Sequence, residues 1–433
     1  MSKILFDKIF SEHHNYPTGE DISAVDIILP KPIRFKNFLD NEYKCVWIVE
    51  EGGKRFLHTK YFIGTDWLKR NEIAIYIAPK LDDDKQQTNY LEMLFSCLRH
   101  SEVADFTKEL YEIKFEDPPI EIEQKKDLLT PLLIVHFLQV LKIIVRKGLK
   151  KSYYKVENNL NSRIKGKVLV SKTIKKNILK NKPLNTFCNY DEFGLNGAEN
   201  RLLKNTLMFV QKYLALFPNY STMASRIINY CLPAFQQIDD TIDVRTTKEI
   251  KTNVFFKEYS EAIRLAHLIL KRFGYNIKNL ETEKAEVVKV PPFWIDMSKL
   301  FELYVLGLLK DKYHNDVEYH FKGIHGQEPD FLLVSEKDKV IIDTKYTKKY
   351  KLGFYNEYLV DNIRQLSGYA RDIKILSRLG VDTNENQNIV LDCLIIYPDQ
   401  DASETLAEDL RADKVNEFIR FYKMPIKLPT INA

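Results

Sequence analysis

Residues 329–345 read PDFLLVSEKDKVIIDTK, and this stretch decides the fold of the C-terminal third of the chain. Two apolar runs, 331–334 and 340–342, flank a short polar turn, which predicts a β-hairpin with buried strands. Asp330 stands at the start of the first strand and Asp343 at the end of the second. The two carboxylates are therefore expected to converge at one end of a bent sheet.

The residues around Asp343 indicate the chemistry of this edge. Asp343 and Lys345 lie on the same side of the strand, because side chains alternate with a period of two. Convergent carboxylates, with a backbone carbonyl such as that of Thr344, offer the hard oxygen ligands that Mg²⁺ needs. A lysine beside the metal can position or deprotonate a water and offset the charge of a phosphorane. The set favours metal-assisted hydrolysis of a phosphodiester; the structural alternative is a salt-bridged pair at a strand end.

Two neighbouring segments add polar groups to the same candidate site. Glu302 is the lone acid in an apolar helical turn, residues 300–305, upstream of the hairpin. Downstream of the hairpin, Gln365 and Tyr369 are four residues apart and share one face of an expected helix. A glutamine and a tyrosine in these places can hold a phosphate or align the lysine.

Residues 289–433 are predicted to form one compact α/β domain of ordinary size. The pair Pro291-Pro292 stops any helix that precedes it. The expected helices span residues 297–312, 355–379 and 405–422, and the expected strands span 317–322, 330–335, 339–345 and 389–397.

The rest of the chain predicts two further domains, so we expect a multidomain α+β or α/β protein. Residues 1–88 are β-rich: short apolar runs flank Gly52-Gly53, which is a hairpin signal, and Pro79 ends the pattern. Over residues 89–288 the apolar period is mostly helical. The longest expected helices there span residues 132–145, 198–216 and 255–273.

Positive charge concentrates in residues 125–182, where 16 Lys and Arg stand against two acids. This segment carries +14 in a chain whose net charge is +5, so the remainder carries −9. Such a footprint predicts salt-dependent contact with DNA or RNA, and the alternative is a solvated helix face balanced by acids elsewhere. The candidate nucleic-acid-binding residues are Arg163, Lys165, Lys167, Lys172, Lys175 and Lys176.

Together these motifs resemble a known family. Pro329-Asp330, Asp343-Thr344-Lys345 and Gln365-x-x-x-Tyr369 are similar to the PD-(D/E)xK nuclease signature, with the QxxxY variant of RecB-like nucleases. The run FWIDMSKLFELYV at 293–305 more narrowly resembles the McrC family, the nuclease subunit of the modification-dependent McrBC restriction system. Two weaker similarities to that family are IAPK at 77–80 and RIKGK at 163–167.

The resemblance implies a Mg²⁺-dependent DNA-cleaving subunit, with Mn²⁺ as a substitute, in antiphage defence against DNA that carries 5-methylcytosine. Its partner would be McrB, an AAA+ GTPase that forms rings, and its N-terminal domain would contact and stimulate that partner. Asp330, Asp343 and, near them, Glu302 would hold the metal, and Lys345 would be the catalytic lysine. Gln365 and Tyr369 would support the site. Many relatives in the nuclease superfamily have Glu where this chain has Asp343, a variant that the superfamily tolerates.

Several other kinds of site are disfavoured. The motifs GxxxxGK[ST] and GxGxxG are absent, so the chain itself should bind no nucleotide. The spacing of His314, His320 and His325 matches no closed zinc site. Only Cys393 follows the nuclease motif, which excludes an iron–sulfur cluster ligated by cysteines that flank it. Five scattered cysteines and the lack of a signal peptide or a long apolar stretch predict a cytoplasmic protein without a membrane partner.

Two alternatives to the restriction subunit remain open. One is an autonomous RecB-like nuclease of DNA repair or recombination, which would also lack an ATPase motif. The other is a catalytically inactive DNA-binding adaptor that kept the fold. The presence of both aspartates, the lysine, the glutamine and the tyrosine argues against loss of catalysis.

Overall fold

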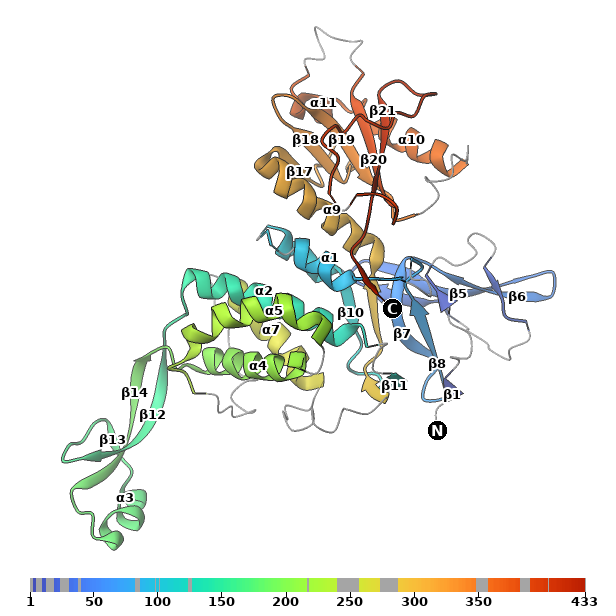
Figure 1. The fold of residues 1–433 in the computed structure, drawn as a ribbon. Coiled ribbons are helices and arrows are strands. Elements are labelled where there is room, and N and C mark those ends of the chain that lie inside the picture. The colour runs from blue at the N-terminus through green and yellow to red at the C-terminus, as the bar shows by residue number, and fades with distance from the viewer. Residues whose placement is uncertain are drawn as a thin grey trace. The chain divides into compact units, whose positions relative to one another are not determined.

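The computed structural model describes residues 3–4, 10–12, 19–23, 31–37, 40–81, 86–97, 99–100, 102–123, 127–215, 218–239, 257–272, 287–347, 357–381, 390–403 and 405–432. The chain divides into two compact units, one of residues 1–132 with 287–433 and the other of residues 133–286 (Figure 1). The boundary expected at residue 289 falls close to this division. In contrast, residues 89–132, which we expected in the middle domain, lie in the first unit.

Two sheets form the N-terminal part of the first unit, which we call the β-lobe. Strands β5 (Glu42–Glu51) and β6 (Lys54–Thr59) form the predicted hairpin, and Gly52 and Gly53 turn it with positive φ angles of 58° and 76°. β6 and β5 pair with β3 (Glu20–Asp21) and β4 (Ile33–Lys36). The second sheet has the order β1 (Lys3–Ile4), β8 (Ile73–Ala78), β7 (Phe62–Lys69), β16 (Phe293–Asp296) and β10 (Tyr111–Ile113), and β2 (Phe10–Ser11) also pairs with β8. A shared apolar core joins the two sheets.

Strand β16 connects the β-lobe directly to the C-terminal sheet. It pairs with β7 and β10, although we expected its residues in the nuclease domain. Helix α9 (Met297–Tyr313) begins at the next residue, because Asp296 caps it by accepting a hydrogen bond from Lys299 N at 3.0 Å. Helix α1 (Tyr90–Cys97) packs closely on α9 at Gly307, and the end of the chain returns to this unit as β22 (Thr430–Asn432), which pairs with β9 (Gln86–Thr88).

The C-terminal sheet has the order β17-β18-β19-β20-β21. Strands β17 (Val317–Tyr319), β18 (Phe331–Val334) and β19 (Lys339–Thr344) are antiparallel, as the predicted hairpin requires. Strand β20 (Asp392–Pro398) runs parallel to β19, and β21 (Phe421–Ile426) runs parallel to β20. Side chains of α10 (Glu357–Tyr369) and α11 (Ile373–Arg378) complete the apolar core against this sheet.

The closing helix expected over residues 405–422 is wrong. The described residues there form turns and then strand β21. Arg411 and Arg420 both bind Asp392, which is 2% exposed at the start of β20. These ion pairs and the pairing of β21 with β20 outweigh the helical periodicity of the segment.

In the second unit, α4 (Ala198–Ala215) packs with α5 (Pro218–Cys231) and α7 (Lys257–Arg272). Helix α2 (Leu129–Lys147) is long and apolar enough to cross a membrane, but 78% of its most apolar window is buried in the protein, as in a core helix.

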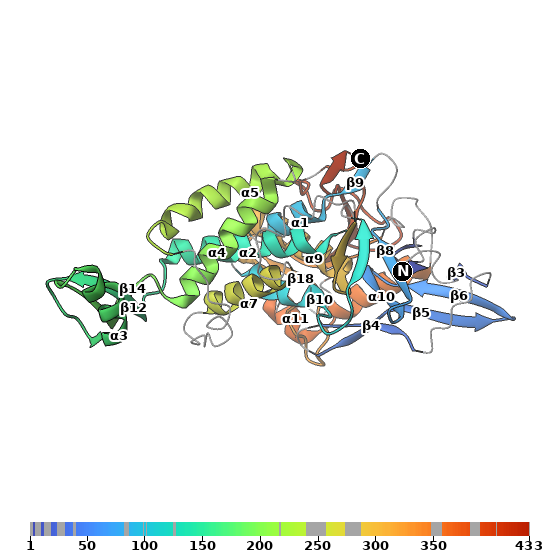
Figure 2. The ribbon, with the colours of Figure 1, turned by 90° about the horizontal axis from the view of Figure 1, so that it is seen from below.

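The helical expectation for this region is wrong at residues 152–194, which we call the arm. Strands β12 (Ser152–Asn161) and β14 (Asn185–Gly194) form a long hairpin, with β13 (Lys167–Val168) and α3 (Val170–Lys176) between them. Figures 1 and 2 show the hairpin leading away from α4 and α5, with α3 at its far end.

Candidate active site

Asp330 and Asp343 face each other at one end of the C-terminal sheet. Phe331 of β18 pairs with Ile342 of β19, so the next residues outward are these two acids. Thr344 N and Oγ1 each donate to Asp330 Oδ2 at 2.6 Å. The structure therefore brings the two carboxylates together as the sequence pattern predicts.

A chain of polar contacts links Asp343 to helix α10. Asp343 is 2% exposed, and Lys345 Nζ lies 2.5 Å from its Oδ2. Lys345 Nζ also donates to Gln365 Oε1 at 3.1 Å, and Gln365 Nε2 donates to Tyr369 Oη at 2.8 Å. Gln365 and Tyr369 therefore orient the lysine, which is one of the two roles that their spacing predicts.

Glu302 enters the same group from helix α9. Its Oε1 accepts a hydrogen bond from the Tyr319 hydroxyl and lies 3.2 Å from Lys299 Nζ and 2.8 Å from His320 Nε2. Burial alone would raise the pKa of Glu302, but the hydrogen bond to His320 and the positive charge of Lys299 lower this pKa to about 2. The carboxylate is therefore ionised at neutral pH and suited to hold a cation.

His320 joins the carboxylates as a nitrogen donor. One ligand atom each of Glu302, His320 and Asp330 lies within 4.8 Å of the others. The second ring nitrogen of His320, Nδ1, lies 3.6 Å from Glu328 Oε2, and Nε2 faces Glu302. A histidine with a carboxylate near one ring nitrogen and the other nitrogen directed at the site resembles the arrangement of a metal-ligating histidine.

The backbone places His320 in this position under strain. Its φ is +51°, in the left-handed region that residues with a Cβ seldom adopt, and its N–H donates to Asp330 O at 3.1 Å. The spacing of His314, His320 and His325 gives no sign of this placement. His320 directly follows the short strand β17, and the direction of that strand determines where its side chain lies. Of the three histidines, only His320 belongs to the carboxylate group among the described residues.

The electrostatics of the group fit a divalent cation. Burial raises the pKa of Asp330 well above its usual range, and the nearby negative charges of Asp343 and Glu302 raise it further. Burial likewise raises the pKa of Asp343, although Lys345 opposes this effect. Three crowded carboxylates are costly without a cation, and their oxygens match Mg²⁺. The added imidazole nitrogen suits Mn²⁺ at least as well.

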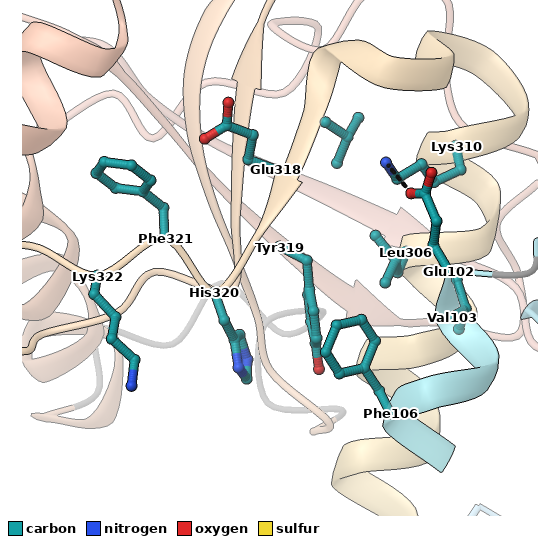
Figure 3. Close-up of a pocket in the computed structure, with 11 residues that line it drawn as sticks. Glu102, Val103, Phe106, Leu306, Lys310, Glu318, Tyr319, His320, Phe321 and Lys322 are labelled. Atoms are coloured by element: carbon teal, nitrogen blue, oxygen red, sulfur yellow. Dashed lines mark ion pairs between the residues drawn. The ribbon is translucent and has the colours of Figure 1, made fainter. Parts of the chain in front are cut away.

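An open pocket of about 570 Å³ adjoins the site on the outer side of β17 (Figure 3). The Tyr319 ring lies between Phe106 and His320, with ring centroids 4.5 Å and 4.0 Å apart, respectively. Lys310 forms an ion pair with Glu102 at 3.0 Å on its far wall. Tyr319 and His320, which both contact Glu302, therefore also line this pocket.

The arm presents the six expected nucleic-acid-binding residues on its surface, and all of them are exposed. Lys165 pairs with Glu192 at 3.1 Å and Lys172 pairs with Glu157, so part of the positive charge is neutralised. The same arm exposes large apolar side chains. These are Tyr153, Ile164, Val170, Ile174, Ile178, Leu179, Leu184 and Phe193.

Comparisons with known proteins place the chain in a family. Residues 57–375 match the family model described as McrBC 5-methylcytosine restriction system component. No curated protein matches the sequence. A refined half-complex of Thermococcus gammatolerans McrB AAA+ hexamers with bound McrC is 16% identical, with 88% of this chain and 80% of that chain covered and a TM-score of 0.35. The cryo-EM structure of the T. gammatolerans McrBC complex is also 16% identical, with 61% and 69% covered and a TM-score of 0.29. Because the matched model spans well over half of its residues, the chain belongs to the McrBC 5-methylcytosine restriction system component family.

Proposed function

We propose that this protein is the Mg²⁺-dependent endonuclease subunit of a McrBC-type restriction system, with a PD-(D/E)xK active site. The observation that carries the proposal is the convergence of Glu302, His320 and Asp330, with Asp343 and an oriented Lys345 beside them. Family membership supports the restriction system, and the geometry supports hydrolysis of a phosphodiester.

Each side chain has a defined task in this proposal. Glu302, His320 and Asp330, together with Asp343, would hold a divalent cation, which would supply Lewis-acid polarisation of a phosphoryl oxygen. Lys345, fixed between Asp343 and Gln365, directs its ammonium at the scissile phosphate and offsets the negative charge that develops on it. Thr344 orients Asp330 through two hydrogen bonds to one oxygen. Tyr369 acts through Gln365, whose amide donates to its hydroxyl oxygen.

The partners proposed are DNA and an AAA+ GTPase of the McrB type. The lysines of the arm offer contacts for DNA phosphates. The exposed apolar side chains on the same arm favour a protein surface instead, because such side chains gain by leaving water. All five cysteines are buried, and Cys45, Cys188, Cys231 and Cys393 are free thiols, which supports a reducing cytoplasm.

Calorimetry and plasmid cleavage test this function together. Titration with Mn²⁺ and Mg²⁺ should show binding in the parent protein, and binding should weaken when Asp330 or Asp343 is replaced by Asn. Supercoiled plasmid should be cut when Mg²⁺ and the partner GTPase are present and should stay intact with EDTA. Binding of neither metal, together with no cutting, would instead support the inactive adaptor. Cutting without a partner would support the autonomous nuclease.

A further inference from the structure

The run Ile77-Ala78-Pro79-Lys80 is one of the two weaker family similarities. Its last residue, Lys80, contacts the chain just after β19 of the C-terminal sheet. Lys80 Nζ donates to the backbone oxygen of Tyr346 at 2.7 Å. The same ammonium lies 3.9 Å from the centre of the Tyr346 ring and 4.3 Å from that of Tyr61. Tyr346 is 4% exposed and directly follows Lys345 in the chain.

Glu12 supports Lys80 from within the β-lobe. It follows β2 and is fully buried, and its N–H donates to Ala78 O at 3.0 Å. Lys80 N contacts Glu12 Oε1 at 3.4 Å. Burial raises the pKa of Glu12 to about 7, against the opposing effects of the Lys80 charge and the Tyr346 hydroxyl. One cluster thus forms beside the end of β19, and it consists of Glu12, Lys80, Tyr61 and Tyr346.

The backbone beyond β19 explains why this cluster matters. Lys345 N donates to Ile396 O of β20 at 2.9 Å, but Thr347 N turns back to Lys345 O at 2.7 Å. The chain therefore leaves the sheet immediately after the lysine. Among the described residues, Tyr346 contacts Lys80 and Tyr61 of the β-lobe and Phe301 of α9, whose ring centre is 5.8 Å away.

We infer that Lys80, which contacts Glu12, is a positioning residue for Lys345. By holding Tyr346, Lys80 determines the position of the Lys345 ammonium, so the β-lobe controls the nuclease site. This inference rests on the proposed function. A misplacement of about 1 Å in a reacting group can lower a rate by about a hundredfold. An event in the β-lobe that moved Lys80 could therefore switch cleavage without touching the carboxylates.

Two variants of Lys80 and one matched control test the inference. Lys80→Met keeps the side-chain length and removes the ammonium, whereas Lys80→Arg keeps a cation that can donate to Tyr346 O. Lys114→Met removes another partly buried ion pair of the β-lobe, the one with Asp66 at 2.6 Å, which makes no contact with Tyr346 among the described residues. All three would be assayed as full chains with the partner GTPase, Mg²⁺ and plasmid, with the rate expressed per folded molecule.

We expect Lys80→Met to lower kcat by about tenfold to a hundredfold with KM for DNA unchanged. Lys80→Arg should recover most of this loss, and Lys114→Met should keep the parental kcat even if its melting temperature falls. If Lys80→Met retains the parental kcat, or if Lys80→Arg is as slow as Lys80→Met, the positioning role is overturned.

Amide hydrogen exchange separates this inference from the proposed function, because it needs no cleavage. Lys80→Met should speed exchange at the amides of Lys345 and Thr347, and Lys114→Met should leave these amides as in the parent. Unchanged exchange in Lys80→Met contradicts the inference, whatever the activity. Faster exchange in Lys80→Met, together with a parent protein that never cleaves DNA, would contradict the proposed function and keep the link between the β-lobe and the strand.

Discussion

The edge of the C-terminal sheet and the arm both concentrate charge, but they differ in how that charge is held. At the sheet edge, each carboxylate is largely buried and has a named donor, such as Thr344 for Asp330 and Lys345 for Asp343. On the arm, the lysines are exposed and lie beside exposed apolar side chains. Burial holds the carboxylates at the sheet edge in a fixed geometry. The lysines of the arm form an exposed surface, and what they contribute depends on the partner that binds there.

The largest effect should come from removing one buried carboxylate at the sheet edge. Asp343→Asn should lower plasmid cleavage by about a thousandfold, because it removes a cation ligand and the ionic partner of Lys345. DNA affinity, measured by fluorescence anisotropy, should remain as in the parent.

A buried acid on the adjacent strand provides the control. Asp392 is as buried as Asp343, but it binds Arg411 and Arg420 away from the carboxylate group. Asp392→Asn should therefore lower stability and leave the cleavage rate per folded molecule unchanged. Equal cutting by Asp343→Asn and the parent would show that the sheet edge is not the active site.

Glu12 is a buried acid outside the candidate active site, and it can be compared with the acids of the sheet edge. Its pKa is raised from 4.5 to about 7, so its contribution to stability is fully present below pH 4.5 and is lost as pH rises through 7. At pH 8 the parent should be about 3 kcal/mol less stable than it would be with an unshifted Glu12.

Urea unfolding at pH 5 and pH 8 checks this prediction. Glu12→Gln should gain stability relative to the parent as pH rises from 5 to 8. A difference between variant and parent that stays constant across this range would mean that Glu12 does not change its charge there.

A smaller effect is expected from His320. His320→Ala should weaken Mn²⁺ binding by about tenfold to a hundredfold in calorimetry, since it removes a nitrogen donor beside Glu302. The exposed His325, five residues later, offers a matched control, and His325→Ala should bind Mn²⁺ as the parent does. Equal affinities for the two variants would remove His320 from the metal site.

The smallest effects on the folded protein are expected on the arm. Lys175→Glu with Lys176→Glu should leave the free energy of unfolding within about 0.5 kcal/mol of the parent, because both lysines are exposed. The slope of log affinity for DNA against log salt should become shallower by about 2.

Ile178→Ser with Leu179→Ser is the matched change in the apolar part of the same arm. It should leave the salt slope unchanged and weaken binding to the partner GTPase. If the lysine variant keeps the parental slope while the apolar variant loses the partner, the arm serves the protein partner and not DNA.

The same contrast explains what could be predicted from the sequence. The pattern of β18 and β19 fixes which residues face each other, because a buried strand allows one register, and this placed Asp330 and Asp343. The charge density of residues 125–182 does not fix a register or an element type. The arm folds as a hairpin where we expected helix. His320 could not be found from spacing, since its place depends on a left-handed backbone at the end of β17. The contact of Lys80 with Tyr346 joins residues 266 positions apart, which no local pattern reports.

Cleavage of methylated and unmethylated plasmid in Mg²⁺, with and without the partner AAA+ GTPase and GTP, tests the central claim most directly. We expect cutting only when the plasmid is methylated and both the partner and GTP are present, and no cutting by Asp343→Asn. Cutting of either plasmid by the chain alone would contradict the restriction-subunit function and indicate an autonomous nuclease.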